Sequence, residues 1–405
     1  MYISRALENT VLSIQNSFPV LLITGPRQIG KTTMLRKLST ADRQYVTLDD
    51  PLLRDLAVTD PALFLQRFRP PVIIDEIQYA PALLPHIKML VDQSRRNGDF
   101  WLTGSQMFHL MKNASESLAG RVGIVNMLGL SMNETTTQCS APYSTRPESL
   151  LPKAKTVRQH SLAEMFSIIF RGSMPALYVN ESINTDIFFS SYVQTYLQRD
   201  VKDLTQVGDE LTFFRFVVAV AARTGHMVNY AELAKDIGIS APTAKQWLSI
   251  LISSGLVALI EPYFNNALKR IIKSPKMYFL DTGLCAYLTK WTTPEALEAG
   301  AMSGAFFETW VVSEIIKSYY NAGKRPPLYY YRDKDQKEID LIIHENNILY
   351  PIEIKKSGNP GKTATKHFEV LKQTGLEIGT GNIICLANDL LPIDKNNWYV
   401  PAWMI

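Results

Sequence analysis

A glycine-rich segment near the amino terminus has the residue types that bind nucleotide phosphates. The stretch Gly25-Pro-Arg-Gln-Ile-Gly30-Lys31-Thr32 fits the pattern GxxxxGK[ST], with an apolar run before it and a helix-like run after it. Glycines allow backbone N–H groups to surround phosphate oxygens, and the positive end of the following helix adds to the attraction. The lysine neutralises phosphate charge, and the Thr32 hydroxyl can ligate Mg²⁺. The residues predicted to contact ATP are Gly25, Pro26, Arg27, Gln28, Ile29, Gly30, Lys31, Thr32 and Thr33.

Two adjacent acids, Asp75 and Glu76, supply the second half of such a site. They end the apolar run Val72-Ile-Ile, which is typical of a buried strand. In this position Asp75 is predicted to ligate Mg²⁺, and Glu76 is predicted to polarise the attacking water. The alternative is that the two acids only begin a loop.

Three further residues are candidates for contact with the phosphates or the water. The apolar run at 100–104 ends in Thr103-Gly-Ser105, and either hydroxyl could reach the γ-phosphate or the water. The alternative is a plain β-turn. Arg121 could sense phosphate charge in its own chain or in a neighbouring subunit of a homo-oligomer, and the alternative is a solvated arginine.

Two strand-like runs near the carboxyl terminus, EIDLIIH and ILYPIEIK, predict a β-hairpin. A two-residue turn at Asn346-Asn347 fixes the register, because paired residue numbers then sum to a constant. Asp340 then lies opposite Glu353 on one face, and the alternate positions form an apolar face. Two carboxylates about 5 Å apart repel each other unless a cation or protons lie between them.

This pair of acids predicts a second metal site. Oxygen ligands at such a separation suit Mg²⁺ or Mn²⁺, so Asp340 and Glu353 are the predicted ligands. Lys355 on the same face can steady a hydroxide or a phosphate, and Glu308 in the preceding helix-like run can add a third acid. The alternative is a set of salt bridges on a solvated face, and Pro351 weakens the register because proline suits edge strands.

The order of strand-like and helix-like runs predicts the fold class. Apolar runs alternate with helical stretches in residues 1–130, which indicates an α/β domain with a mostly parallel sheet. These runs are 19–24, 44–48, 71–75, 100–104 and 122–128. Residues 131–160 are polar and rich in Ser, Thr and Pro, and they predict a linker or surface excursion. Residues 161–210 are predicted to be helical.

Residues 211–295 predict a winged-helix-like domain. A helix from Tyr230, a turn at Gly238-Ile-Ser240 and a second helix from Pro242 have the apolar spacing of a helix-turn-helix, and later apolar runs would form the wing. The second helix has few basic side chains, whereas Lys269, Arg270, Lys273 and Lys276 are close together in the wing. Contact with DNA and packing on the ATPase domain as a lid remain equal alternatives.

Composition restricts the class of protein. The chain has 405 residues, a net charge of +4 and three cysteines. No CxxC pair occurs, so neither a disulfide framework nor a zinc knuckle is expected. No apolar run is long enough for a membrane span, and we expect a cytoplasmic protein without a membrane partner.

The motifs together resemble a known family. GPRQIGKTT, YVTLDDP, IIDEIQYAP, LTGSQ and SLAGRV occur in the order found in bacterial and archaeal AAA-type ATPases that carry a C-terminal domain of undefined function. The resemblance implies ATP binding and covers nearly the whole chain. In residues 300–405, the order of helix, Asp and ExK on a hairpin resembles the PD-(D/E)xK nucleases, which implies an α+β fold.

Three functions are compatible with these patterns. The first is an ATP-dependent enzyme that acts on DNA or RNA and carries a C-terminal nuclease. The second is a regulatory or signalling ATPase whose nuclease-like domain only binds nucleic acid or a protein. The third is an ATPase chaperone that acts on a protein partner.

Overall fold

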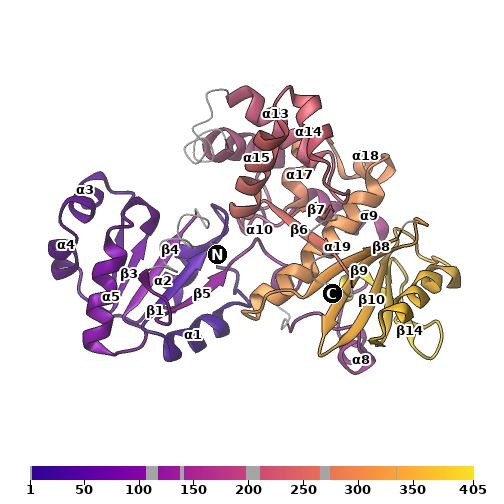
Figure 1. Cartoon of the computed structure of the whole chain (residues 1–405), viewed down its shortest axis with the longest axis horizontal. Coiled ribbons are helices and arrows are strands. Elements are labelled where there is room, and N and C mark those ends of the chain that lie inside the picture. The colour runs from indigo at the N-terminus through magenta and orange to yellow at the C-terminus, as the bar shows by residue number, and fades with distance from the viewer. Residues whose placement is uncertain (1, 106–116, 137–140, 198–209, 265–273, 334) are drawn as a thin grey trace.

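The computed structural model describes residues 2–105, 117–136, 141–197, 210–264, 274–333 and 335–405. Figure 1 shows an N-terminal part, in indigo and purple, beside a larger body of helices and C-terminal strands. Within these ranges no helix is both long and apolar enough to cross a membrane.

The N-terminal part is built on a parallel five-stranded sheet in the order β2-β3-β4-β1-β5. Successive residues of β1 face opposite sides, so Val20 and Leu22 pack in one apolar cluster while Leu21 and Ile23 pack in another. The predicted mostly parallel α/β sheet is confirmed. Its strands are β1 (Val20–Thr24), β2 (Gln44–Thr47), β3 (Val72–Asp75), β4 (Phe100–Gly104) and β5 (Val122–Asn126). Its helices are α1 (Glu8–Ser17), α2 (Lys31–Leu38), α3 (Pro51–Thr59), α4 (Pro61–Arg67), η1 (Ile77–Tyr79) and α5 (Leu83–Ser94).

The segment after β5 is more buried than its composition suggests. Glu134 and Tyr143 have only 3% and 1% of their surface exposed. The prediction of a surface excursion is therefore wrong for these residues, because a helix cap and an ion pair satisfy Glu134, and hydrogen bonds with Ser318 and Asn382 satisfy Tyr143. The residues at 137–140 lie outside the described part. The helices of this segment and of the next are α7 (Met132–Thr135), α8 (Pro147–Ala154), α9 (Leu162–Arg171), α10 (Ala176–Val179), α11 (Thr185–Tyr192), η2 (Val193–Leu197) and α13 (Glu210–Ala221).

The segment predicted to form a helix-turn-helix contains two helices, α14 and α15, and Gly238, with a φ of 78°, ends α14 in the left-handed region. An antiparallel pair, β6 and β7, follows it. Of the predicted basic cluster, Lys269, Arg270 and Lys273 lie outside the described residues, whereas Lys276 begins β7 and is buried. The elements are α14 (Tyr230–Ile237), α15 (Ala241–Ser253), β6 (Val257–Pro262), β7 (Lys276–Phe279), α17 (Thr282–Leu288) and α18 (Pro294–Ala299).

The C-terminal strands form a mixed sheet that also includes β6 and β7. Because β6 pairs with β8 as well as with β7, one nine-stranded sheet crosses from the middle of the chain into its C-terminal part. Its other elements are α19 (Ser303–Asn321), β8 (Leu328–Arg332), β9 (Glu338–Glu345), β10 (Ile348–Ile354), η3 (Lys362–Thr374), β11 (Glu377–Ile378), β12 (Gly381–Cys385), β13 (Leu391–Pro392), β14 (Asn397–Pro401) and η4 (Ala402–Met404). The part after β5 is therefore helical with a mixed sheet.

One helix links the C-terminal sheet to the N-terminal part. The first half of α19 lies against β7, and near its carboxyl end the Asn321 carbonyl accepts a hydrogen bond from Thr10 of α1 at 3.1 Å. A helix of 19 residues is about 28 Å long at 1.5 Å per residue. The helix α19 therefore contacts both parts of the chain.

Candidate functional site

The P-loop lies at the carboxyl edge of β1, and its glycines are required by the backbone. Gly25 has a φ of 144°, and a Cβ there would lie 2.0 Å from the Met127 carbonyl oxygen. Gly30 has a φ of 90° and immediately precedes α2. The chain therefore turns from strand to helix in a shape that side chains at these positions would distort.

The Lys31 ammonium lies inside this loop. It donates hydrogen bonds to the carbonyl oxygens of Gly25 and Pro26 at 2.9 and 2.7 Å. Burial lowers the pKa of Lys31 to about 8, against the opposing effect of the Glu76 and Asp75 carboxylates. The Lys31 cation therefore lies within the loop that the motif predicts to bind phosphate.

The other predicted loop residues differ in their surroundings. Arg27 donates a hydrogen bond to the Tyr79 hydroxyl at 3.1 Å, whereas Gln28 and Thr33 are exposed. Pro26 and Ile29 are buried. Of the residues predicted to contact ATP, only some therefore have a side chain that is exposed enough to contact a ligand.

Asp75 and Thr32 meet as predicted. The Thr32 hydroxyl donates to Asp75 Oδ1 at 2.9 Å, and the Thr103 hydroxyl donates to the same oxygen. Tyr45 donates to the other oxygen, Oδ2, at 3.0 Å, and burial together with Asp75 raises the pKa of Tyr45 to about 12. A hydroxyl and a carboxylate side by side are the hard oxygen donors that Mg²⁺ prefers, so these residues fit that ion.

Glu76 is held beside this pair by its neighbours. Its backbone has a φ of 56°, which is uncommon for a residue with a side chain. Its N–H donates to Thr103 Oγ1 at 3.3 Å, and its carboxylate accepts hydrogen bonds from Gln78 and from Ser105, the latter at 3.4 Å. The structure thus brings both predicted hydroxyls to the acids, and β4 lies between β1 and β3.

Arg121 is not near the P-loop of its own chain. It directly precedes β5, and its carbonyl accepts a hydrogen bond from the N–H of Val20, the first residue of β1. The P-loop follows the opposite end of β1, and the Arg121 guanidinium is paired with both carboxylate oxygens of Asp92. The structure contradicts the predicted role within one chain, because strand direction puts this side chain at the other edge of the sheet.

A buried arginine donates hydrogen bonds to the backbone of the P-loop and of the segment after β5. Arg5 donates to the Ile29 carbonyl at 2.8 Å and to the Leu128 carbonyl at 2.7 Å, and its Nε lies 2.9 Å from Glu134 Oε1. The motif pattern did not identify it, because Arg5 lies far from the motif in sequence. The sequence gives one signal, in that Ser131 and Glu134 have the spacing of a capping box, which the structure contains.

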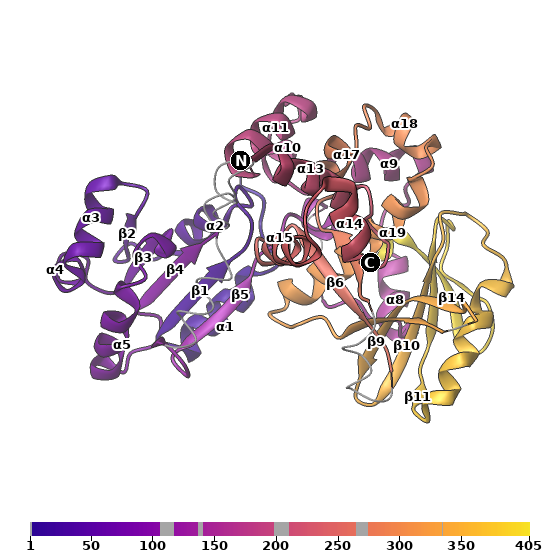
Figure 2. The ribbon, with the colours of Figure 1, turned by 45° about the horizontal axis from the view of Figure 1, so that its top comes forward.

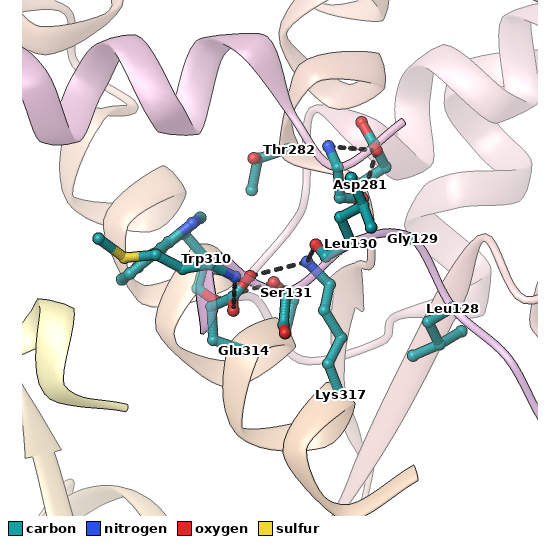
Figure 3. Close-up of polar contacts among 12 residues, drawn as sticks. Leu128, Gly129, Leu130, Ser131, Asp281, Thr282, Trp310, Glu314 and Lys317 are labelled. Atoms are coloured by element: carbon teal, nitrogen blue, oxygen red, sulfur yellow. Dashed lines mark hydrogen bonds and ion pairs between the residues drawn. The ribbon is translucent and has the colours of Figure 1, made fainter. Parts of the chain in front are cut away.

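This network continues into α19. The other oxygen of Glu134 accepts from the Ser131 N–H, and the next residue, Met132, donates its N–H to Glu314 Oε2 at 2.8 Å. Figure 3 shows the Lys317 ammonium between Glu314 and the Leu130 carbonyl, at 2.8 and 3.1 Å. Buried polar contacts therefore connect the P-loop with the long helix.

Replacing Arg5 with methionine is expected to lower the free energy of unfolding by about 3–5 kcal/mol, because it leaves the Glu134 carboxylate buried without its ion-pair partner. Urea unfolding measures this loss. The matched control is Arg158→Met, whose guanidinium pairs with Glu164 at the surface and has 73% of its side chain exposed, and it should leave stability almost unchanged. Equal effects of the two changes would contradict the role assigned to Arg5.

The C-terminal hairpin has the predicted register. Ile348 pairs with Glu345 and Ile352 pairs with Leu341, and the turn residues Asn346 and Asn347 have positive φ values of 52° and 62°. The Asp340 carboxylate accepts the Ile354 N–H at 2.8 Å, so it lies next to Glu353 on the neighbouring strand. The prediction that Pro351 would weaken this register is wrong, because the pairing includes Pro351 with Ile342.

Two ammonium groups lie among the acids of this hairpin. Lys355 Nζ is 2.6 Å from Glu353 Oε1 and 3.9 Å from Asp340 Oδ2. Lys276 Nζ, from β7, is 3.3 Å from Glu308 Oε1 and 3.9 Å from Asp340 Oδ1. The structure therefore brings together all the predicted residues and adds Lys276, which the sequence placed only in the basic wing.

The electrostatics of these acids reflect their burial. Burial and the neighbouring carboxylates of Glu353 and Glu308 raise the pKa of Asp340 well above its usual value. Burial also raises the pKa of Glu353, whose Oε2 is buried without a hydrogen-bond partner. An unpartnered carboxylate oxygen fits a metal ligand. Over the described residues, however, no group of three or more acids, histidines or cysteines is arranged as a formed metal site.

A cleft of about 1110 Å³ is lined in part by Glu308 and Lys276 of this cluster. It is bordered by the start of α14, the start of β7 and the strands β8 and β9. Charged and aromatic side chains line it: Arg223, Tyr230, Lys276, Glu308, Arg332 and Glu338. The cleft is large enough to hold several monomer units of a polymer, and positively charged and aromatic side chains line its walls.

A residue in the turn after α15 contacts the P-loop. Gly255, just after α15, has a φ of 70°, and a Cβ there would lie 2.9 Å from Pro26 Cδ. Figure 2 shows α15 on the side of the helices that faces the N-terminal part. This contact favours the alternative in which the module packs on the ATPase domain.

Comparisons with known proteins divide the chain in three. An AAA domain family matches residues 17–136, and two domains of unknown function, DUF8612 and DUF4143, match residues 163–295 and 303–405. The uncharacterized proteins Mb2031c of Mycobacterium bovis and Rv2008c of Mycobacterium tuberculosis are each 31% identical to the chain over 345 residues, which is 84% of this chain and 71% of theirs.

Solved structures resemble the chain more distantly. The Walker-type ATPase PABY2304 of Pyrococcus abyssi has a TM-score of 0.45 at 13% identity and covers 70% of this chain and 94% of its own. DnaA of Aquifex aeolicus with bound AMPPCP has a TM-score of 0.30 at 10% identity, over 61% and 85% of the two chains. The AAA domain match and the parallel sheet with its P-loop establish an AAA-type P-loop domain, whereas neither C-terminal match identifies a winged-helix or nuclease fold.

Proposed function

This chain belongs to the same family as the two mycobacterial proteins, and on the premise of its AAA domain we propose that it binds ATP with Mg²⁺ and hydrolyses it. The observation that carries this proposal is the meeting of Lys31, Thr32, Asp75 and Glu76 at one edge of the parallel sheet. Residues from two separate motifs converge there, as phosphoryl transfer to water requires.

Each of these residues has a distinct task in the proposed reaction. The backbone N–H groups of the loop and the Lys31 ammonium bind the phosphates. Thr32 and Asp75 would hold Mg²⁺, which supplies positive charge against the phosphate oxygens. Glu76 orients the attacking water and accepts its proton, and Ser105 and Gln78 hold the Glu76 carboxylate in place.

The test of this proposal is phosphate release from ATP as a function of Mg²⁺. The wild-type chain, first treated with a chelator, is expected to release phosphate only after Mg²⁺ is returned. Release that is independent of Mg²⁺ would contradict the roles given to Thr32 and Asp75.

The buried contacts between the P-loop and α19 support a second step, in which hydrolysis is coupled to the C-terminal part. Arg5 joins the Ile29 carbonyl to Glu134, and the backbone N–H groups of Ser131 and Met132 contact Glu134 and Glu314 in turn. This series of polar contacts ends on α19, the helix that carries Glu308. A change in the loop on nucleotide binding would alter this helix if the series has two arrangements. We propose that ATP hydrolysis in this way controls the action of the Asp340–Glu353 site on nucleic acid.

In the nuclease form of this proposal, Asp340, Glu353 and Glu308 would hold a divalent metal, and Lys355 would contact the scissile phosphate. Wild-type protein with Mg²⁺ or Mn²⁺ is expected to cut at least one of single-stranded, duplex or branched DNA or RNA, with a rate that depends on ATP. Asp340→Ala is expected to lower cleavage by about a hundredfold or more, because a metal ligand is lost. Gel electrophoresis of labelled substrates measures both.

The absence of metal-dependent cleavage across this panel would reject the nuclease form. The regulatory or signalling form would then hold, with the C-terminal part binding nucleic acid or a protein without cutting.

In a homo-oligomer, Arg121 could reach a neighbouring subunit's nucleotide only after it releases Asp92.

A further inference from the structure

The Lys276 side chain is placed unusually for a lysine. Only 5% of it is exposed, and its ammonium lies 3.3 Å from Glu308, 2.5 Å from Glu338 and 3.9 Å from Asp340. Burial alone would lower the pKa of Lys276, but these three carboxylates raise it above its usual value. The residue is therefore a buried cation surrounded by oxygen atoms.

Two acids beside the Lys276 ammonium, Glu308 and Asp340, belong with Glu353 to the predicted metal ligands, and Lys355 contacts both Asp340 and Glu353. Glu308 comes from α19, Asp340 from β9 and Glu353 from β10, so the donors are fixed on three different elements. Glu353 Oε2 is buried and has no hydrogen-bond partner. An ammonium ion and a metal ion would compete for such a set, because each neutralises the same repulsion between carboxylates.

We propose that Lys276 is an internal cation that takes the place of a divalent metal, so that the metal enters only when the ammonium withdraws. With Lys276 in place, the acids are neutralised and the site is closed. With Lys276 displaced, Asp340, Glu353 and Glu308 become ligands for Mg²⁺ or Mn²⁺. The inference rests on the proposed metal site and adds its regulation.

The Lys276 side chain borders a cleft into which its ammonium can move. Lys276 is the first residue of β7, and it lines the cleft of about 1110 Å³ together with Glu308 and Glu338. Its flexible stem can carry the charge toward this cleft. A phosphate group of a bound polynucleotide would offer the ammonium a new partner there, and substrate binding would then prepare the metal site.

The test is calorimetric titration of the full chain with Mn²⁺ in the absence of nucleotide. Lys276→Met is expected to bind Mn²⁺ about tenfold tighter than wild type or more, since it removes a positive charge within about 4 Å of the ligands. Adding Asp340→Asn to Lys276→Met should abolish this gain, which separates the site from any binding at the P-loop.

The matched control is Lys355→Met. This change removes the same charge from the same cluster, but the Lys355 side chain is 43% exposed and contacts Glu353 Oε1 and Asp340 Oδ2, whereas Lys276 contacts Asp340 Oδ1. Lys276→Met is expected to gain clearly more affinity than Lys355→Met. Equal gains would show a general effect of charge and would overturn the inference, as would an unchanged affinity in Lys276→Met.

If Lys276→Met is unstable because the buried acids have lost a counter-cation, thermal unfolding still tests the inference. Its melting temperature is expected to fall below that of wild type and to recover when Mn²⁺ is added, with no recovery in the double variant carrying Asp340→Asn. A fall that Mn²⁺ does not reverse makes Lys276 a structural ion-pair partner and overturns the inference. If Mn²⁺ binds to neither wild type nor any variant, the proposed metal site fails as well, whereas equal binding overturns the inference alone.

Discussion

Replacing Lys31 with alanine is expected to weaken ATP binding by about a hundredfold or more. The ammonium is buried in the loop and would make charge-assisted hydrogen bonds to the phosphates, and the loss of two such bonds is worth about 3 kcal/mol or more. The loop itself should remain folded, because Gly25 and Gly30 set its backbone. Calorimetric titration with ATP measures the change.

Lys37→Ala is the matched control, because Lys37 lies on the same helix, α2, but is exposed. This variant should bind ATP as wild type does. Undiminished affinity in Lys31→Ala would remove the P-loop from the account.

The same lysine gives ATP binding a pH dependence. Burial lowers the pKa of Lys31 to about 8, so the side chain is mostly charged at pH 7 and mostly neutral at pH 9. The phosphates attract only the charged form, and the ATP affinity of wild type is therefore expected to fall as the pH rises from about 7 to about 9. Lys31→Ala should lack this trend.

Replacing Glu76 with glutamine is expected to slow ATP turnover by about a hundredfold or more, with ATP affinity nearly unchanged. An amide has almost the size of the carboxylate but cannot accept the proton of the attacking water, and such transfers typically contribute 10²- to 10⁴-fold to a rate. Steady-state phosphate release and ATP titration separate the two quantities.

Glu148→Gln serves as the control, since Glu148 is an exposed acid in the first turn of α8. Its turnover should equal that of wild type. Near-normal turnover in Glu76→Gln would mean that another residue positions the water.

Local patterns in the sequence predicted much of this structure. The alternation of short apolar runs with helical stretches and the glycine motif placed the P-loop, Asp75 and Glu76 at one edge of a parallel sheet, where the structure has them. A two-residue turn at Asn346-Asn347 allows only one pairing between the residues of the two flanking strands, and the hairpin has this register. In both cases the information lies in adjacent residues.

Long-range contacts were not predictable in this way. Lys276 reaches Asp340 from another strand, and Arg5 reaches Glu134 across most of the N-terminal part. Nothing in the local pattern of a lysine or an arginine distinguishes burial in an ion pair from exposure. The burial of the segment after β5 was also not predicted, because the local pattern of its polar residues does not show which of them are buried.

The misplacement of Arg121 has a different cause. The sequence already put this residue immediately before the strand at 122–128, and residues that precede parallel strands lie at the edge away from the phosphate-binding loops. Strand direction therefore contained the answer, and Arg121 pairs with Asp92 at that edge.

The most direct test of the central claim, that the AAA-type domain hydrolyses ATP, is phosphate release measured side by side for wild type and Lys31→Ala with ATP and Mg²⁺. The account predicts steady release by wild type and only background release by the variant. Equal release by the two proteins, or none above background by wild type, would contradict it.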